Sequence, residues 1–279
     1  MFRLIKQGLK TGVVTTDYPD RADPAPPGYR GKPEVDASKV TLEAFEKSAA
    51  ACPSQAIRFL RQGPTGWSLE INYGRCVFCG LCEEASQGAV RMTEEYELAA
   101  KRKEDLVLAV SNDPTGGSEE IETLGDRLKE KIGRLFGRSL HIREVDAGSC
   151  NACEWEITAL LNPIYDIQRF GIDFVASPRH ADMLLVTGPV TRNMETALKK
   201  TYDATPDPKL VAAVGACACD GGLFAESYAC RGGLDRVLPV DVYIPGCPPR
   251  PQALLHGILL ALDRLPQKIK KGKILSNGS

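Results

Sequence analysis

The stretch KLVAAVGACACDGG, residues 209–222, decides the fold of this chain. Its apolar run, residues 210–214, ends at Gly215 and is followed by Cys217 and Cys219. A short apolar run bounded by glycine is typical of a β-strand. The stretch therefore predicts a strand with cysteines at its carboxyl end.

Similar runs occur on both sides of this strand. The other segments that read as strands are 139–147, 172–177, 181–190 and 240–247, and those that read as helices are 154–162, 191–203 and 249–265. Alternating strands and helices indicate a parallel sheet that helices cover on both faces. We therefore expect a parallel-sheet, flavodoxin-like α/β domain over residues 140–265.

The ends of three predicted strands carry cysteines, which are Cys150, Cys153, Cys217 and Cys247. Ligands of open parallel sheets gather at the carboxyl ends of the strands, so these thiolates are expected to converge. Four thiolates are the ligand set of a 4Fe-4S cluster. A four-thiolate zinc site and four buried structural cysteines are the alternatives. Cys219 and Cys230 are expected to be small packed thiols.

A second cysteine run, RCVFCGLCEEASQGAV, occupies residues 75–90. Its cysteines at positions 76, 79 and 82 resemble one half of a two-cluster bacterial ferredoxin. The fourth cysteine of such a run would stand at position 86, where this chain has Ser86.

The missing ligand has a counterpart upstream. The pair Cys52 and Pro53 matches the end of the other ferredoxin run, and the three leading positions of that run hold Leu42, Phe45 and Ser48. In these ferredoxins the fourth cysteine of each run serves the other cluster. All the missing ligands then belong to one deleted cluster, and Leu42 and Phe45 would fill its volume. The retained ligands form one intact 4Fe-4S site: Cys52, Cys76, Cys79 and Cys82. Zinc is the alternative here too, although its sites favour paired CxxC spacing.

Three separated motifs of the C-terminal half resemble a known family. GSCNACEWEI (148–157), GACACDGGLF (215–224) and VDVYIPGCPPRPQALL (240–255) are similar to the small subunit of complex-I-like, energy-converting nickel-iron hydrogenases, including formate hydrogenlyase. They also resemble the B subunit of NADH-quinone oxidoreductase, in which the first two cluster cysteines are adjacent. Here two residues separate Cys150 from Cys153, which favours the hydrogenase branch. The resemblance covers about residues 120–265.

The resemblance implies a role for the C-terminal cysteines. Cys150, Cys153, Cys217 and Cys247 would bind the cluster nearest the catalytic centre of a partner, the large subunit that holds nickel and iron. The chain would then pass single electrons and make no bonds itself. No zincin motif, phosphate loop or nucleophile elbow competes with this interpretation.

The sequence also suggests how the chain is divided. We expect an extended, proline-rich arm over residues 1–37, lying on a partner or on the next domain, and a small α+β ferredoxin-like domain over 38–110. A linker with an amphipathic helix would occupy 111–139, and a basic tail would follow the α/β domain at 266–279.

Composition narrows the setting. The 279 residues carry a net charge of -1, which gives no pull toward nucleic acid, and ten cysteines, which suit metal binding in a reducing compartment. No secretory signal or spanning segment is apparent, so we expect a cytoplasmic chain, peripheral on the membrane through its partner subunits.

The resulting hypothesis is an electron-transfer subunit with two 4Fe-4S clusters in a membrane-associated, energy-converting nickel-iron hydrogenase. Its partners would be the nickel-iron large subunit, other hydrophilic and membrane subunits, and an upstream carrier such as ferredoxin or a formate dehydrogenase module. The alternatives are a B-like component of a quinone oxidoreductase and a zinc-stabilised scaffold without a redox role.

Overall fold

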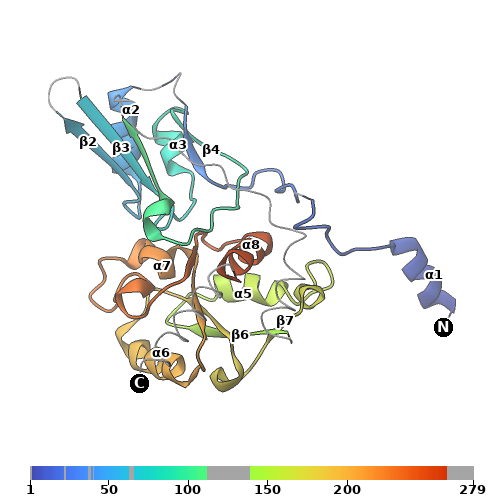
Figure 1. Ribbon diagram of the computed structural model, residues 1–279. Coiled ribbons are helices and arrows are strands. Elements are labelled where there is room, and N and C mark those ends of the chain that lie inside the picture. Colours follow the sequence, from blue (N-terminus) through green and yellow to red (C-terminus); the bar gives the residue numbers. More distant parts are fainter. Residues whose placement is uncertain are drawn as a thin grey trace.

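The C-terminal half of the chain forms a five-stranded, fully parallel sheet (Figure 1). The computed structural model describes residues 2–21, 23–36, 39, 41–62, 66–111 and 139–262. In chain order the strands are β6 (Leu140–Asp146), β7 (Ile172–Phe174), β8 (Met183–Thr187), β9 (Leu210–Val214) and β10 (Val242–Ile244). Their spatial order, β10-β9-β8-β6-β7, is the 2-1-3-4-5 order of flavodoxin-like folds. The predicted α/β fold class is confirmed.

Helices cover both faces of this sheet. They are α5 (Ala152–Ala159), α6 (Arg192–Ala204), α7 (Gly215–Asp220) and α8 (Pro251–Leu262). Helices α5 and α8 pack on one face, through residues such as Ile157 and Leu254, and α6 and α7 pack on the other through Leu198 and Ala218. Every residue of the central strands β8 and β9 is buried. The continuous apolar runs are therefore the signature of strands without a solvent face.

The segment after β9 forms the helix α7, which begins at Gly215 with a φ of +83°. Alanines at 216 and 218 favour the helix. Cys217 therefore lies in the first turn of a helix. Cys219, two residues later on the other side of this helix, is fully buried, as expected for a packed thiol.

A smaller α+β unit lies above the parallel sheet in Figure 1. Its antiparallel sheet has the order β2-β3-β5, and a separate two-stranded ladder joins β1 to β4. The elements are β1 (Pro33–Val35), α2 (Leu42–Ala51), β2 (Ile57–Gln62), β3 (Gly66–Asn72), α3 (Leu81–Ala85), β4 (Val90–Met92) and β5 (Val107–Ser111). Short 3₁₀ helices complete the chain at Lys103–Leu106, Ile167–Phe170, Pro178–His180, Gly222–Phe224 and Leu234–Arg236.

Helix α2 carries the positions of the deleted ligands. Phe45 is fully buried, with its ring 5.2 Å from that of Trp67, and Ser48 is fully buried against the carbonyl of Cys82. Leu42, in contrast, is 40% exposed, so the prediction that it fills the volume of a lost cluster was wrong. Each step of three residues on an α-helix turns a side chain by about 60°, so Leu42, the first residue of α2, lies about 60° from Phe45 and about 120° from Ser48.

The N-terminal arm ties the two units together. After helix α1 (Phe2–Thr11), which projects from the body in Figure 1, the backbone N-H of Thr16 donates to Ile164 O at 2.8 Å. Further on, Tyr96 Oη donates to the carbonyl of Asp23, and Gly31 N donates to Thr93 O. The arm thus runs from the α/β unit to the small unit.

A second junction centres on Asp220, the last residue of α7. Its carboxylate accepts hydrogen bonds from Asn72 Nδ2 at 2.8 Å and from Lys103 Nζ at 2.7 Å, and Arg75 Nε lies 3.7 Å away. The Asp220 side chain is only 13% exposed. A two-bond bridge between Ala100 and Tyr243 also extends the edge of the parallel sheet at β10.

The remaining expectations fall partly outside the described residues. The structure does not describe residues 119–138, where an amphipathic helix is predicted, or residues 266–279, where a basic tail is predicted. Among the residues that are described, no helix has the length and apolar character needed to span a bilayer.

Candidate metal centres

The four N-terminal cysteines meet around one small cavity of about 20 Å³. Cys52 caps the carboxyl end of α2, Cys76 and Cys79 lie in the loop before α3, and Cys82 lies within α3. All four line this cavity, together with Ile57, Phe78, Gly80 and Met92. The structure therefore brings together the residues that the crossed ferredoxin pattern assigns to one site.

The local backbone directs donors toward these sulfurs. Phe78 N donates to Cys76 Sγ at 3.3 Å, and Ala56 N donates to Cys52 Sγ at 3.2 Å. Phe78 and Gly80 both have left-handed backbone conformations, with φ of +53° and +83°, which bend the loop around the cavity. Backbone N-H groups aimed at sulfur stabilise thiolates.

The surroundings of the N-terminal cysteines raise the pKa values of their thiols. Burial, against the lowering effect of the Phe78 N-H and with smaller contributions from the thiols of Cys82, Cys52 and Cys79, raises the pKa of Cys76 to about 12. Burial, with Cys79 and Cys52, likewise raises the pKa of Cys82 to about 11. Crowded, buried thiols resist ionisation unless a bound cation compensates the charge. This donor set fits an iron-sulfur cluster, whose iron atoms bind thiolates.

The C-terminal set comes from three strand ends, as predicted. Cys150 and Cys153 flank the start of α5, Cys217 lies in α7, and Cys247 lies in the loop between β10 and α8. Burial raises the pKa of Cys153, and Glu154 and the thiols of Cys217, Cys247 and Cys150 add to the rise. Cys217 has its pKa raised to about 11 by burial and then by Cys247 and Cys150. Residues far apart in sequence thus share one electrostatic environment.

Glycines leave room for the C-terminal sulfurs. A Cβ atom at Gly215 would lie 2.6 Å from Cys153 Sγ, which is closer than two such atoms approach. A Cβ atom at Gly222 would lie 3.4 Å from Cys217 Sγ, in ordinary contact. Gly215 therefore keeps open the space that Cys153 occupies.

The other two cysteines differ. Cys219 Sγ donates to the carbonyl of Ala213 at 3.5 Å and is completely buried. Cys230 is half-buried, forms a backbone β-bridge with Thr191, and lies near enough to Cys217 to raise the pKa of that thiol.

Within the described ranges, no three His, Cys, Asp or Glu side chains form a group that could hold a single metal ion.

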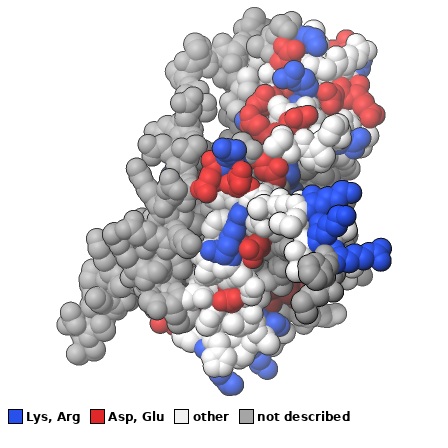
Figure 2. Space-filling view, turned by 90° about the vertical axis from the view of Figure 1, so that its right-hand side faces the viewer, with Lys and Arg blue, Asp and Glu red and all other residues white. Residues whose placement is uncertain are grey.

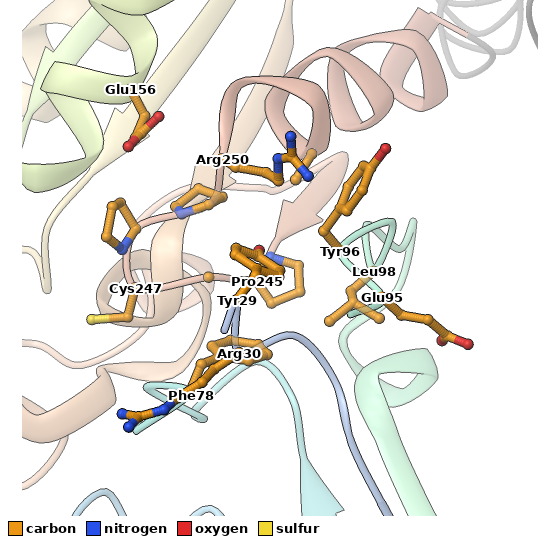
Figure 3. A pocket seen from close by; sticks show the side chains of 14 residues that line it. Tyr29, Arg30, Phe78, Glu95, Tyr96, Leu98, Glu156, Pro245, Cys247 and Arg250 are labelled. Atoms are coloured by element: carbon orange, nitrogen blue, oxygen red, sulfur yellow. The ribbon is translucent and has the colours of Figure 1, made fainter. Parts of the chain in front are cut away.

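A larger cavity of about 240 Å³ lies where the α/β unit meets the small unit (Figure 3). Cys247 lines it on the side of the α/β unit, and Arg30 and Phe78 line it on the side of the small unit. Phe78 also lines the N-terminal cysteine cavity, so its ring borders both spaces. Burial, then Cys150 and Cys79, raise the pKa of Cys247, so Cys79 of the N-terminal set lies close enough to Cys247 to act on it.

Sequence reasoning did not find the residues of this junction. Arg250 lies with its guanidinium 4.4 Å from the centre of the Tyr96 ring and 5.6 Å from that of Tyr29. Like Arg30 and Phe78, these residues come from segments distant in sequence. The only signal available was that Arg250 closes the motif PGCPPR, shortly after Cys247.

Comparison with known proteins links the C-terminal half to a family. Residues 150–261 match the family described as NADH ubiquinone oxidoreductase, 20 Kd subunit. The matched segment begins at Cys150 and contains all four cysteines of the C-terminal set.

Three relatives illustrate the range of this similarity. The chain is 53% identical over 147 residues to the "Probable membrane-bound hydrogenase subunit mbhJ" of Pyrococcus furiosus, covering 52% of this chain and 88% of that protein. It is 49% identical to formate hydrogenlyase subunit 7 of Escherichia coli, covering 51% of this chain and 56% of that protein. It is 50% identical to the B subunit of the NADH-quinone oxidoreductase of Citrifermentans bemidjiense, covering 40% of this chain and 66% of that protein.

Among solved structures, a chain of the membrane-bound sulfane sulfur reductase, an archaeal respiratory membrane complex, aligns with a TM-score of 0.42 and 38% identity. The alignment covers 49% of this chain and 74% of that one.

Proposed function

Because this chain belongs to the NADH ubiquinone oxidoreductase 20 kDa subunit family, we propose that it is the iron-sulfur electron-transfer subunit of a membrane-associated, energy-converting nickel-iron hydrogenase. Its relatives include membrane-bound hydrogenase, formate hydrogenlyase and NADH-quinone oxidoreductase subunits, which together imply an iron-sulfur cluster. The finer proposal is that the chain holds two 4Fe-4S clusters, one in a ferredoxin-like domain at 38–110 and one in the α/β domain at 140–265.

The observation that carries the proposal is the placement of the two cysteine sets. The four N-terminal cysteines line one cavity, and Phe78 lines both that cavity and the one that Cys247 lines. A single structural metal would not require two such sets side by side. A relay does, because electrons pass efficiently only between closely spaced centres.

Each residue has a defined task in this proposal. Cys52, Cys76, Cys79 and Cys82 would hold the N-terminal cluster, and Cys150, Cys153, Cys217 and Cys247 the C-terminal one. When bound, a 4Fe-4S cluster accepts and releases one electron. The chain's own residues hold the sulfurs in place, aim backbone N-H groups at Cys76 and Cys52 and leave Cys76 and Cys153 only partly exposed.

Exposed apolar side chains near the C-terminal set support a partner subunit there. Trp155 on α5 is 75% exposed, and Tyr228, shortly after Phe224, is 90% exposed. Figure 2 shows charged side chains of both signs over the upper part of one face, where the small unit lies, and fewer on the lower part. Large exposed aromatic residues mark interaction surfaces. We propose that the nickel-iron large subunit docks here.

The remaining partners and the location follow from the same assignment. We propose that the N-terminal cluster receives electrons from an upstream carrier such as ferredoxin or a formate dehydrogenase module. The chain would be peripheral on the cytoplasmic side of the membrane, held there by other hydrophilic and membrane subunits. A B-like role in a quinone oxidoreductase is the second candidate, favoured by the 50% identity to that relative.

Metal analysis of the anaerobically purified complex tests the proposal. We expect about eight iron atoms per chain, from two 4Fe-4S clusters, and two distinct EPR signals after reduction. The variant Cys52→Ala should lose the N-terminal signal and retain the C-terminal one. Cys230→Ala, outside both sets, is the matched control and should retain both.

Two results would contradict the proposal or redirect it. About four iron atoms per wild-type chain, or zinc in place of iron, would overturn the two-cluster assignment. Nickel and hydrogen uptake in the same preparation would favour the hydrogenase over the quinone oxidoreductase. Their absence, together with quinone reduction, would favour the second candidate.

A further inference from the structure

Arg30 is the cation that contacts the N-terminal cysteine loop from outside it. Its Nη1 donates to the carbonyl oxygen of Cys79 at 2.6 Å. The guanidinium also lies against Gly80, where an added Cβ would meet Arg30 Nε at 3.2 Å. Gly80 has a φ of +83°, and this glycine lets the arginine approach the loop directly after Cys79.

The same side chain faces the C-terminal site. Arg30 and Cys247 line the same cavity. In Figure 3 the Arg30 guanidinium and the Cys247 sulfur both point to the same side of this cavity, with Phe78 beside the arginine. The positive charge is therefore placed at the junction of the two cysteine sets.

Other charged groups at this cavity are engaged elsewhere. The guanidinium of Arg250 lies over the Tyr96 ring, and its Nε donates to Gln252 at 2.8 Å. Glu95 pairs with Lys32 at 3.2 Å. Glu156 also lines the cavity, and it comes from α5 on the opposite side of Cys247 from the small unit. Arg30 is the charge whose hydrogen bond reaches a cysteine of the N-terminal set.

The geometry points to a tuning role: we infer that Arg30 raises the reduction potential of the N-terminal cluster and, to a smaller extent, that of the C-terminal cluster. The inference rests on the proposed function, because it requires both clusters. Reduction adds one electron to a cluster and makes it more negative. A nearby fixed cation stabilises the reduced form more than the oxidised form, so the potential rises.

The contacts also indicate which cluster's reduction potential Arg30 should raise more. The guanidinium is hydrogen-bonded to a residue of the N-terminal set, whereas its described relation to the C-terminal set is that Arg30 lines the same cavity as Cys247. Arg30 is exposed to solvent, which screens its charge at the longer distance more than at the hydrogen-bonded one. Arg30 would thereby change the difference in reduction potential between the two clusters.

Potentiometric titration followed by EPR tests this inference, with each cluster read by its own signal. In Arg30→Gln we expect a lower midpoint potential for the N-terminal cluster and a smaller decrease for the C-terminal one. Arg21→Gln is the matched control: it removes a cation from the same arm, but Arg21 is exposed and pairs only with Asp17 at 3.7 Å among the contacts described. Both of its midpoints should equal those of the wild type.

A histidine variant separates charge from folding. In Arg30→His the side chain is cationic below a pH of about 6.5 and neutral above it. As the pH is raised from 5.5 to 8, the midpoint potential of the N-terminal cluster should decrease more in Arg30→His than in the wild type. Both values of the variant come from the same folded protein. This comparison decides the matter even where Arg30→Gln loses its cluster.

The outcomes are distinct. Unchanged midpoints in Arg30→Gln with both signals present, or identical pH dependence in Arg30→His and wild type, would overturn the tuning role. A wild-type chain with fewer than two clusters would instead overturn the proposed function, and the iron content shows this before any titration begins.

Discussion

The substitution Asp220→Asn tests whether the two units are held together by the buried ionic junction. Asp220 Oδ1 accepts from Lys103 at 2.7 Å, and Oδ2 accepts from Asn72 at 2.8 Å. An asparagine of the same shape has one oxygen and one NH₂ group. Whichever way the amide turns, its NH₂ faces a donor, so one former hydrogen bond becomes a clash between donors.

The expected loss in free energy of unfolding is about 3 kcal/mol. Breaking a buried ion pair by removing one partner costs roughly 3–5 kcal/mol, and an exposed pair is worth about 0–1 kcal/mol. Asp220 is 13% exposed and Lys103 is 24% exposed, so the junction lies near the lower end of the buried range. With a urea m-value of about 3 kcal/mol/M, the unfolding midpoint should fall by about 1 M.

Anaerobic urea titration provides the assay. Trp67 packs against Phe45 in the small unit, so its fluorescence in a Trp155→Phe background reports on that unit. Asp235→Asn is the control, because Asp235 contacts the same Lys103 at 3.0 Å but is 29% exposed, and it should lower the midpoint by less than half as much. Equal midpoints for Asp220→Asn and Asp235→Asn would refute the reasoning.

Two further substitutions give separate tests. In Gly215→Ala, the left-handed φ of +83° costs about 1–2 kcal/mol and the new methyl displaces Cys153 Sγ. Iron analysis and EPR should therefore show loss of the C-terminal cluster alone. Gly8→Ala is the control, because its methyl meets open space and should change neither cluster. His256 is buried, and burial lowers its pKa although Glu97 opposes the shift. The unfolded chain therefore binds a proton at this histidine more tightly than the folded chain does. The wild type should then lose stability as pH falls below about 6.5. His256→Gln should flatten this loss, which urea midpoints at pH 5.5 and 7.5 measure, and an unchanged slope would count against the assignment.

The α/β fold was predictable because its strands are buried on both faces. Uninterrupted apolar runs such as 210–214 admit few other interpretations, and right-handed crossovers restrict how such strands connect. The convergence of Cys150, Cys217 and Cys247 followed from the same topology. These features depend on local pattern and on a general rule of sheets, both of which a sequence contains.

The junction between the units was not predictable in this way. Arg30 meets Cys79 across 49 positions, and Asn72 meets Asp220 across 148. No periodicity relates such residues, because the contacts depend on how two separately folded units are oriented. The misplaced Leu42 has a related cause: spacing in a ferredoxin run identifies positions, but the rotation of α2 about its axis decides which of them is buried.

The arm also sets an order of events during synthesis. Asp23, near the start of the chain, hydrogen-bonds to Gln252 in the last described helix, 229 positions later. The arm therefore cannot take its final place until nearly the whole polypeptide has left the ribosome, since domains generally fold from the N-terminus as they emerge. Arg30 needs much less of the chain, because its hydrogen bond is to Cys79 and the neighbouring Gly31 donates to Thr93. The part of the arm that holds Arg30 would therefore settle on the small unit before the part that holds Asp23 settles on α8.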